Sequence, residues 1–104
     1  MIRDNQFKRF DAYSVETFAF DLHGVYALYD TAYNVTYYGR ANGIGVTIKS
    51  RLKDHLSGRE GRCTQSANFF KQEATANAAE RERELLHEYY RTHGRLPRCN
   101  DRVG

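Results

Sequence analysis

Two neighbouring stretches of sequence decide the fold: residues 24–30, GVYALYD, and residues 34–39, NVTYYG. Both are rich in Val, Tyr and Thr, which favour extended backbone because their side chains pack well on a pleated surface. Only a short polar connection separates the two runs. The pattern therefore predicts a β-hairpin that places Tyr26 and Tyr37 on paired strands.

Downstream of a glycine-bearing turn, residues 46–56 have the pattern of an amphipathic helix. The apolar residues that repeat at helical spacing are Ile48, Leu52 and Leu56. Side chains four apart lie one above the other on a helix, so Arg51 and His55 are expected side by side at the border of this apolar stripe. Taken alone, each of them reads as an ordinary boundary residue.

Residues 74–94 form the strongest helical pattern in the chain, with good helix formers throughout and Gly94 as a stop signal. Glu82 falls at the centre of the apolar face of this helix. A carboxylate in such a place is normally paired, hydrogen-bonded or bound to a metal, because an isolated buried charge costs several kcal/mol. The alternative is a glutamate that reaches the edge of the face or bridges to an arginine.

The remaining segments carry weaker signals. Residues 57–66 read as a loop, whereas residues 66–72, SANFFKQ, fit a short strand or a helical turn, of which we favour a strand followed by the start of a helix. Residues 1–22 contain several aromatic side chains, but no hydrophobic periodicity that would indicate a helix or a strand. The sequence predicts an α+β fold with a short antiparallel sheet of about three strands flanked by helices, comprising a lead-in at 1–22 and a domain at 23–104.

Length and charge limit the function. A chain of 104 residues has room for one small domain, and its net charge of +3 fits a polyanionic partner only weakly. No apolar run suggests a membrane span or a signal peptide, so the expected compartment is the cytoplasm. There, Cys63 and Cys99 are expected to remain thiols in loops.

Five spaced elements together resemble the GIY-YIG endonuclease family across residues 23–101. They are Gly24-Val25-Tyr26, Tyr37-Tyr38-Gly39, Arg51 with His55, Glu82 with Leu85 and Leu86, and Pro97 with Asn100. Two features depart from the family pattern: Arg40 follows the second element where other members often carry lysine or another polar residue, and Asn100 lies farther from Glu82 than in compact members. The resemblance implies a small nuclease domain that hydrolyses a phosphodiester of DNA.

The resemblance also implies roles for the residues. Glu82 would hold Mg²⁺ or Mn²⁺, and Arg51 would clamp the non-bridging phosphate oxygens. We favour Tyr37 as general base, Tyr26 as orienter of phosphate or water, and His55 as proton relay, although each of the three remains a candidate base. Further contacts to the substrate are expected from Gly39, Arg40, Lys49 and Asn100.

One metal site implies one nick at a time, so cutting both strands would need a dimer or two successive visits. A partner protein is a further expected source of specificity. The main alternative is a nucleic-acid-binding accessory module of the same fold that no longer cuts. A third reading is a protein-interaction domain that uses the N-terminal aromatic residues.

Overall fold

The strand at the centre of the sheet, β2 (Gly24–Tyr29), is buried along its whole length in the computed structural model, which describes residues 1–100. On one side β2 pairs with β3 (Val35–Ala41), and on the other with β4 (Phe69–Ala74). A two-residue strand, β1 (Lys8–Arg9), lies beyond β4, so the sheet has four antiparallel strands in the order β1-β4-β2-β3. The α+β class and the hairpin are confirmed; the expected sheet of about three strands has a fourth.

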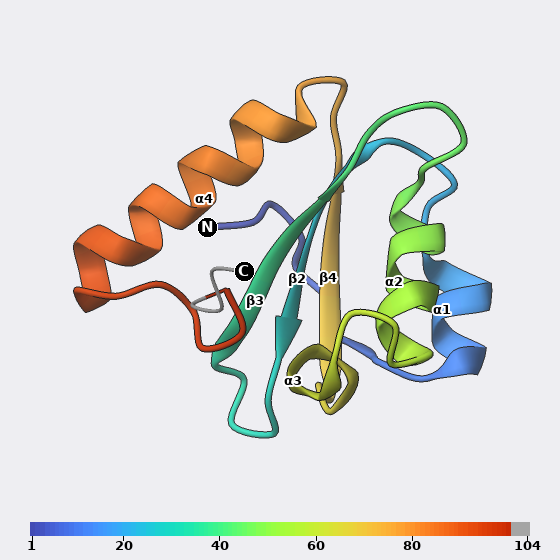
Figure 1. Ribbon diagram of the computed structural model, residues 1–104, viewed down its shortest axis with the longest axis horizontal. Helices are drawn as coiled ribbons and strands as arrows, with labels where there is room; N and C mark the ends of the chain where they lie inside the picture. Colours follow the sequence, from blue (N-terminus) through green and yellow to red (C-terminus); the bar gives the residue numbers. More distant parts are fainter. Residues whose placement is uncertain (101–104) are drawn as a thin grey trace.

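Helices cover both faces of this sheet (Figure 1). They are α1 (Ala12–Phe18), α2 (Ile48–Leu56), α3 (Arg62–Gln65) and α4 (Ala78–His93). Because side chains alternate along a strand, Tyr26 and Leu28 of β2 pack into the core with α1 and α2. Val25 and Ala27 pack with α4 on the opposite face. β2 is therefore apolar on both faces, which explains why its sequence shows no polar alternation.

The pairing of β2 with β3 decides where the tyrosines point. Tyr26 lies opposite Gly39, and Leu28 lies opposite Tyr37, which places both tyrosines on the face covered by α1 and α2. The register then shifts between Leu28 and Tyr29, so that one extra residue of β3 is accommodated as a bulge. The hairpin thus delivers two phenol groups to one side of the sheet.

The two predicted helices are confirmed, and each has a defined end. At the start of α2, Thr47 and Ser50 bond each other's backbone in a capping box. Ile48 and Leu52 are fully buried on its inner side, which fixes the rotation of the helix. The C-terminal end of α4 is Gly94, whose φ of 73° is the left-handed conformation that glycine adopts easily.

The N-terminal segment contains regular secondary structure that the sequence pattern did not predict. Residues 1–22 include both β1 and α1, and Phe10, Val15 and Ala19 belong to the same core as Tyr26. The strand at residues 69–74 is confirmed, whereas the expected loop at 57–66 contains the short helix α3. The last four residues of the expected domain lie outside the described residues. Within residues 1–100, no helix has the length and apolarity that a membrane span requires.

Candidate active site

Tyr26 and Tyr37 meet across a glycine. A Cβ atom placed on Gly39 would lie 2.4 Å from Cζ of Tyr26 and 2.7 Å from a ring carbon of Tyr37. Such distances are well inside van der Waals contact, so any larger residue at position 39 would push the phenol rings out of place. The ring centroids of the two tyrosines lie 6.1 Å apart. Gly39 was predicted to contact substrate; in the structure, its lack of a side chain leaves room for the rings of Tyr26 and Tyr37.

His55 joins Tyr26 to the loop that carries α3. Its Nε2 atom lies 2.8 Å from the hydroxyl of Tyr26, and its Nδ1 atom lies 2.7 Å from the hydroxyl of Thr64. The imidazole is 1% exposed and also packs edge-on against Tyr37, at 5.0 Å between centroids. When Thr64 donates to Nδ1, Nε2–H donates to Tyr26; in the other tautomer both directions reverse. The chain Thr64–His55–Tyr26 is thus able to shift protons.

Burial changes the acid–base properties of all three rings. Burial, and then Arg51, lower the pKa of His55 to about 4, so the imidazole is neutral at pH 7. Burial, and then Tyr37, raise the pKa of Tyr26 well above its usual value. Burial, followed by the negative charge of Glu82, raises the pKa of Tyr37 as well. At neutral pH the structure therefore holds two phenols and a neutral imidazole.

Arg51 projects from α2 beside these rings and is held by two carboxylates. Its Nη1 atom lies 3.1 Å from Asp54 and 3.4 Å from Glu60. The positive charge of Arg51 lowers the pKa of both Tyr26 and Tyr37 in part, so it lies within electrostatic reach of the two phenols. Asp54 and Glu60 keep this guanidinium in place and leave it partly neutralised.

Glu82 lies on the helix that covers the other face of the sheet. It belongs to α4, and its Oε1 atom lies 3.2 Å from Nη1 of Arg40 on the edge strand β3. Burial raises the pKa of the Glu82 carboxyl, while Arg40 acts in the opposite direction. The charge of Glu82 is one of the causes that raise the pKa of Tyr37 and of Tyr26, although α4 packs on the face of the sheet opposite to these two phenols.

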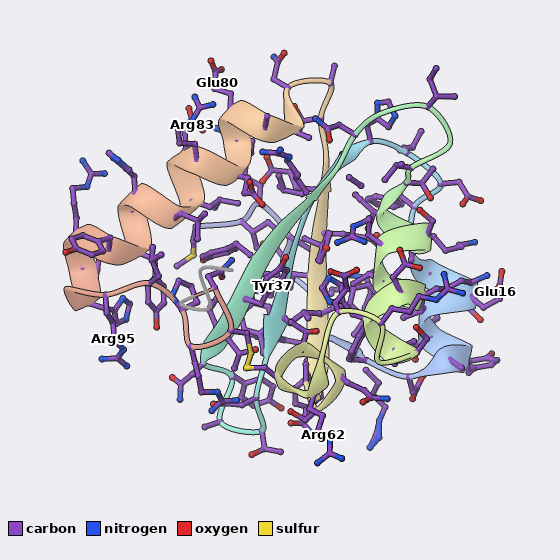
Figure 2. The ribbon with its side chains drawn as sticks, viewed as in Figure 1. Glu16, Tyr37, Arg62, Glu80, Arg83 and Arg95 are labelled. Carbon is purple, nitrogen blue, oxygen red and sulfur yellow. A yellow bond between two sulfur atoms is a disulfide. The ribbon has the colours of Figure 1, made fainter. Side chains whose placement is uncertain are left out.

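A cavity of about 560 Å³ opens beside Tyr37 and His55. Its lining residues are Tyr37, His55, Arg59, Glu60, Gly61, Thr64, Cys99 and Asn100. Figure 2 shows Tyr37 on β3 in the middle of the molecule, away from the outer surface of α4. Sequence reasoning did not select Arg59, Glu60 or Thr64, because a loop with no periodicity gives no sign of which side chains turn inward.

Asn100 stands at the border of this cavity, but its amide is already engaged. The side-chain oxygen accepts a hydrogen bond from the backbone N–H of Tyr38 at 2.8 Å, and the side-chain nitrogen donates to the carbonyl of Tyr38 at 3.0 Å. The amide thereby pairs with the free edge of β3 as a neighbouring strand would. Its predicted contact with substrate stays a prediction.

Lys49 does not converge with the other predicted residues. Its ammonium group lies 3.6 Å from both Glu16 and Asp21, two acidic residues of the N-terminal segment. Arg40, by contrast, is beside Glu82. Of the predicted substrate-binding residues, the structure therefore brings Gly39, Arg40 and Asn100 to the site region and leaves Lys49 beside α1.

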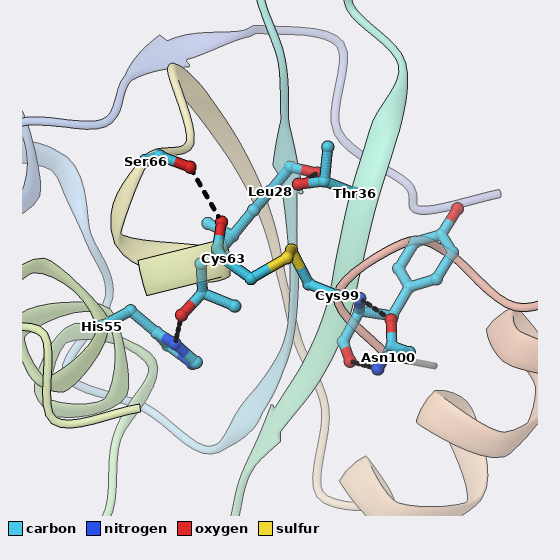
Figure 3. Close-up of a disulfide and its surroundings, with 9 residues drawn as sticks. Leu28, Thr36, His55, Cys63, Ser66, Cys99 and Asn100 are labelled. Carbon is cyan, nitrogen blue, oxygen red and sulfur yellow. Dashed lines mark hydrogen bonds between the residues drawn. A yellow bond between two sulfur atoms is a disulfide. The ribbon is translucent and has the colours of Figure 1, made fainter. Parts of the chain in front are cut away.

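Cys63 and Cys99 form a disulfide, so the prediction of two free thiols is wrong (Figure 3). The two residues are 36 positions apart, and nothing local in the sequence shows that they meet. They meet because the C-terminal segment returns along β3, where the N–H of Cys99 donates to the carbonyl of Thr36 at 2.8 Å. Cysteine pairing therefore gives no support for a reducing compartment. The disulfide joins two walls of the cavity.

The residues present fit a metal ion that takes most of its ligands from outside the protein. Among residues 1–100, no group of three or more His, Cys, Asp or Glu side chains is arranged to hold a metal. Mg²⁺ commonly binds through one or two carboxylates and keeps several waters, so Glu82 alone is compatible with it. A partly desolvated carboxylate with a raised pKa also gains from a nearby cation. Such an ion would compete with Arg40.

Comparison of the chain with models of protein families, with curated proteins and with solved structures gives no match.

Proposed function

We propose that this protein is a metal-dependent DNA endonuclease of the GIY-YIG type that nicks one strand per site. The observation that carries the proposal is a cluster in which Tyr37 and His55 line one cavity and Tyr26 is hydrogen-bonded to His55. The charges of Arg51 and Glu82 act on the pKa of both phenols. Phosphodiester hydrolysis needs a proton acceptor for the attacking water and positive charge for the phosphate. Tyr37 in the lining of the cavity offers the first, and Arg51 beside the rings offers the second.

The positive charge that the chain itself supplies comes from Arg51. Its planar guanidinium can form two parallel hydrogen bonds to phosphate oxygens, and its charge is permanent. In the structure this group bonds Asp54 and Glu60, so a phosphate must displace or share these partners. Glu82 would hold Mg²⁺ or Mn²⁺, which supplies additional charge against the phosphate and favours the loss of a proton from water.

Tyr37 is the general base in this proposal, with Tyr26 and His55 behind it. Neutralising Glu82 removes the second largest cause of the raised pKa of Tyr37, which brings its phenol closer to ionisation near the substrate. Tyr26 lies against Tyr37 and is bonded to His55, so it can orient the phenol and pass a proton toward the imidazole. His55 is neutral at pH 7 and is free to take part in such a relay.

Incubation of supercoiled plasmid with the protein tests the proposal. We expect conversion to the nicked circle in the presence of Mg²⁺ and none in EDTA. Gel electrophoresis over a time course should show nicked circles before linear DNA, because one site cuts one strand per visit. Absence of nicking with Mg²⁺ and Mn²⁺ on plasmid, branched and single-stranded substrates would overturn the proposal.

The second candidate is a binding module that no longer cuts. The observation that favours it is the neutralisation of both key charges, since Arg51 is paired with Asp54 and Glu60, and Glu82 with Arg40. This candidate predicts DNA binding that weakens with salt, without cleavage of any substrate. The plasmid experiment therefore separates the two candidates.

The pH dependence of nicking tests the choice of base. Because the pKa of Tyr37 is raised, the ionised fraction at neutral pH is small and increases about tenfold per pH unit. We expect the single-turnover rate to rise with pH between 7 and 9, and Tyr37→Phe to lose this rise. His55→Ala should be slower but should keep the rise. Because His55 is already neutral at pH 7, a wild-type rate that is flat between pH 7 and 9 and is lost in His55→Ala would assign the base to His55 instead.

The buried His55 also predicts how stability depends on pH. The unfolded imidazole titrates near pH 6.5, whereas burial lowers the pKa of His55 to about 4 in the folded protein. Between these values the unfolded chain binds the extra proton, so stability is full above pH 6.5 and falls toward pH 4, by up to about 3 kcal/mol. Urea unfolding from pH 7.5 to 4.5 should show this fall. In His55→Gln the fall should be clearly smaller; an identical pH dependence in both proteins would contradict the assignment.

A further inference from the structure

A second and larger cavity, of about 770 Å³, lies on the α4 side of the sheet and is called the α4 cleft below. Its walls come from the N-terminus, the β2–β3 hairpin and the C-terminal half of α4 with the segment that follows. The lining residues used below are Phe7, Tyr33, Tyr38, Lys71 and Arg95, with the acidic residues Asp30 and Glu88. None of the residues that line the cavity beside Tyr37 and His55 lines this one.

One wall of the α4 cleft is an exposed aromatic surface built on Tyr33. The Tyr33 ring stacks on Phe69 at 4.9 Å between centroids and touches Phe7 at 4.7 Å. Despite these contacts, 54% of Tyr33 and 40% of Phe7 remain exposed. Both rings therefore keep apolar surface available to a ligand.

The backbone of Tyr33 gives a second observation. Its φ is 65°, and it is the one residue other than glycine with positive φ among residues 1–100. A bulky side chain is disfavoured in this left-handed conformation, whereas Asn or Gly adopts it readily. The hairpin therefore carries an aromatic ring at a position where turn geometry alone favours a small residue. Such strain is concentrated at ligand-binding positions.

Three cationic side chains line the same cleft, Lys71, Arg95 and Arg98. The ammonium group of Lys71 lies 4.1 Å from the centroid of Phe7, and Arg95 stands at the C-terminal end of α4 (Figure 2). Within residues 1–100, neither Lys71 nor Arg95 forms an ion pair with a side chain. Of the two acidic residues in the lining, Glu88 pairs with the N-terminal amine, and Asp30 accepts the N–H groups of its own turn.

Exposed rings and cations in one cleft match the chemistry of an unpaired nucleic-acid strand. Bases stack on the rings while the cations contact the phosphates, and every base offers a face for stacking. Duplex DNA cannot use the rings in this way, because its bases already stack on one another. An acidic peptide would satisfy the cations but would leave the aromatic wall without a matched partner.

We propose that the α4 cleft binds an unpaired segment of a DNA strand, with Tyr33 as the stacking platform and with Lys71 and Arg95 as phosphate contacts. The choice of DNA as the polymer rests on the proposed nuclease function; the stacking chemistry does not. Tyr37 and Tyr38 are neighbours on edge strand β3 and point to its opposite faces, so the two cavities lie on either side of one strand. We therefore expect this protein to bind most tightly to DNA substrates that combine a duplex with an unpaired segment.

Fluorescence anisotropy with labelled dT12 in EDTA, where cleavage does not occur, tests the proposal. We expect wild-type protein to bind dT12 at least about tenfold more tightly than a 12-base-pair duplex. Tyr33→Asn should weaken dT12 binding about tenfold, the size of one lost stacking contact. Asn relieves the strained φ, so the fold should be retained, as thermal unfolding will show. Lys71→Gln should weaken binding and reduce its dependence on salt.

Tyr90→Gln is the matched control, because Tyr90 is 55% exposed on α4 but does not line the cleft. It should bind dT12 as wild type does. Equal affinities of Tyr33→Asn and wild type for dT12, or equal binding of dT12 and duplex by wild type, would overturn the proposal. Binding of rU12 at least ten times tighter than dT12 would show that the occupant of the cleft is RNA and not DNA. Displacement of dT12 by an equal concentration of a glutamate-rich peptide would show that the occupant is an acidic protein.

Plasmid nicking separates this proposal from the nuclease proposal. Nicking by wild type, with dT12 binding unchanged in Tyr33→Asn, would remove the α4 cleft proposal alone. Absence of nicking, with dT12 binding lost in Tyr33→Asn, would remove the nuclease proposal and leave the cleft as a site for unpaired strands.

Discussion

Glu82→Gln is expected to lower Mg²⁺-dependent nicking by at least about 100- to 1000-fold, the largest effect of any single substitution considered. Glutamine keeps the shape of the side chain but removes the charge that would hold the cation. The fold should survive, because burial raises the pKa of the Glu82 carboxyl and thus already disfavours its charged form. The loss would therefore appear in the rate of nicking, with little change in the free energy of unfolding.

Glu80→Gln is the matched control for this substitution. Glu80 lies on the same helix, but it is exposed and its side chain points to solvent in Figure 2. Single-turnover nicking by this variant should stay within about twofold of wild type, as is usual for a surface position far from the site. If Glu82→Gln nicks as fast as Glu80→Gln, the carboxylate of Glu82 does not hold the catalytic ion.

Loss of the disulfide is expected to have the largest effect on stability. A bond that closes a loop of 36 residues restricts the unfolded chain and stabilises the folded state by about 3–4 kcal/mol in the chain-entropy model. For a domain of this size, the double variant Cys63→Ser with Cys99→Ser should melt roughly 10–20 °C below the oxidised wild type. Thermal unfolding followed by circular dichroism measures this difference.

Reduction provides the control. A phosphine reductant should lower the melting temperature of wild type toward that of the double variant, and should leave the double variant unchanged. A double variant as stable as oxidised wild type would show that the bond contributes no net stability. Loss of the bond should also loosen two local contacts. Thr64 directly follows Cys63 and hydrogen-bonds His55. Asn100 directly follows Cys99 and hydrogen-bonds the backbone of Tyr38 on β3 (Figure 3).

Local patterns identified the principal elements of the fold. The hairpin, α2 and α4 each have a period or a composition that depends on residues close in the sequence, and each is found where it was predicted. The elements that were missed are short. β1 has two residues and exists because Lys8 and Arg9 pair with Phe70 and Phe69 of β4, and no period can be seen in so few residues.

For the candidate site, the sequence predicted the identity of the main residues but not the contacts between them. Its five principal residues were selected by the spacing of motifs, with Tyr26 and Tyr37 placed correctly on paired strands. Their contacts were not predictable, because they join residues far apart in the sequence. His55 bonds Tyr26 from 29 positions away, and Glu82 reaches Arg40 across 42 positions. Thr64 was missed altogether.

The sequence by itself determined the α+β class, the hairpin, the two main helices and the order of the motifs, since propensity and periodicity act over a few neighbouring residues. Only the tertiary structure decided that Cys63 bonds Cys99, that Asn100 pairs with β3 and that Lys49 faces α1. These contacts depend on where the chain returns to the sheet. That return is set by the summed burial of many side chains on two faces, a property that no short stretch of sequence contains.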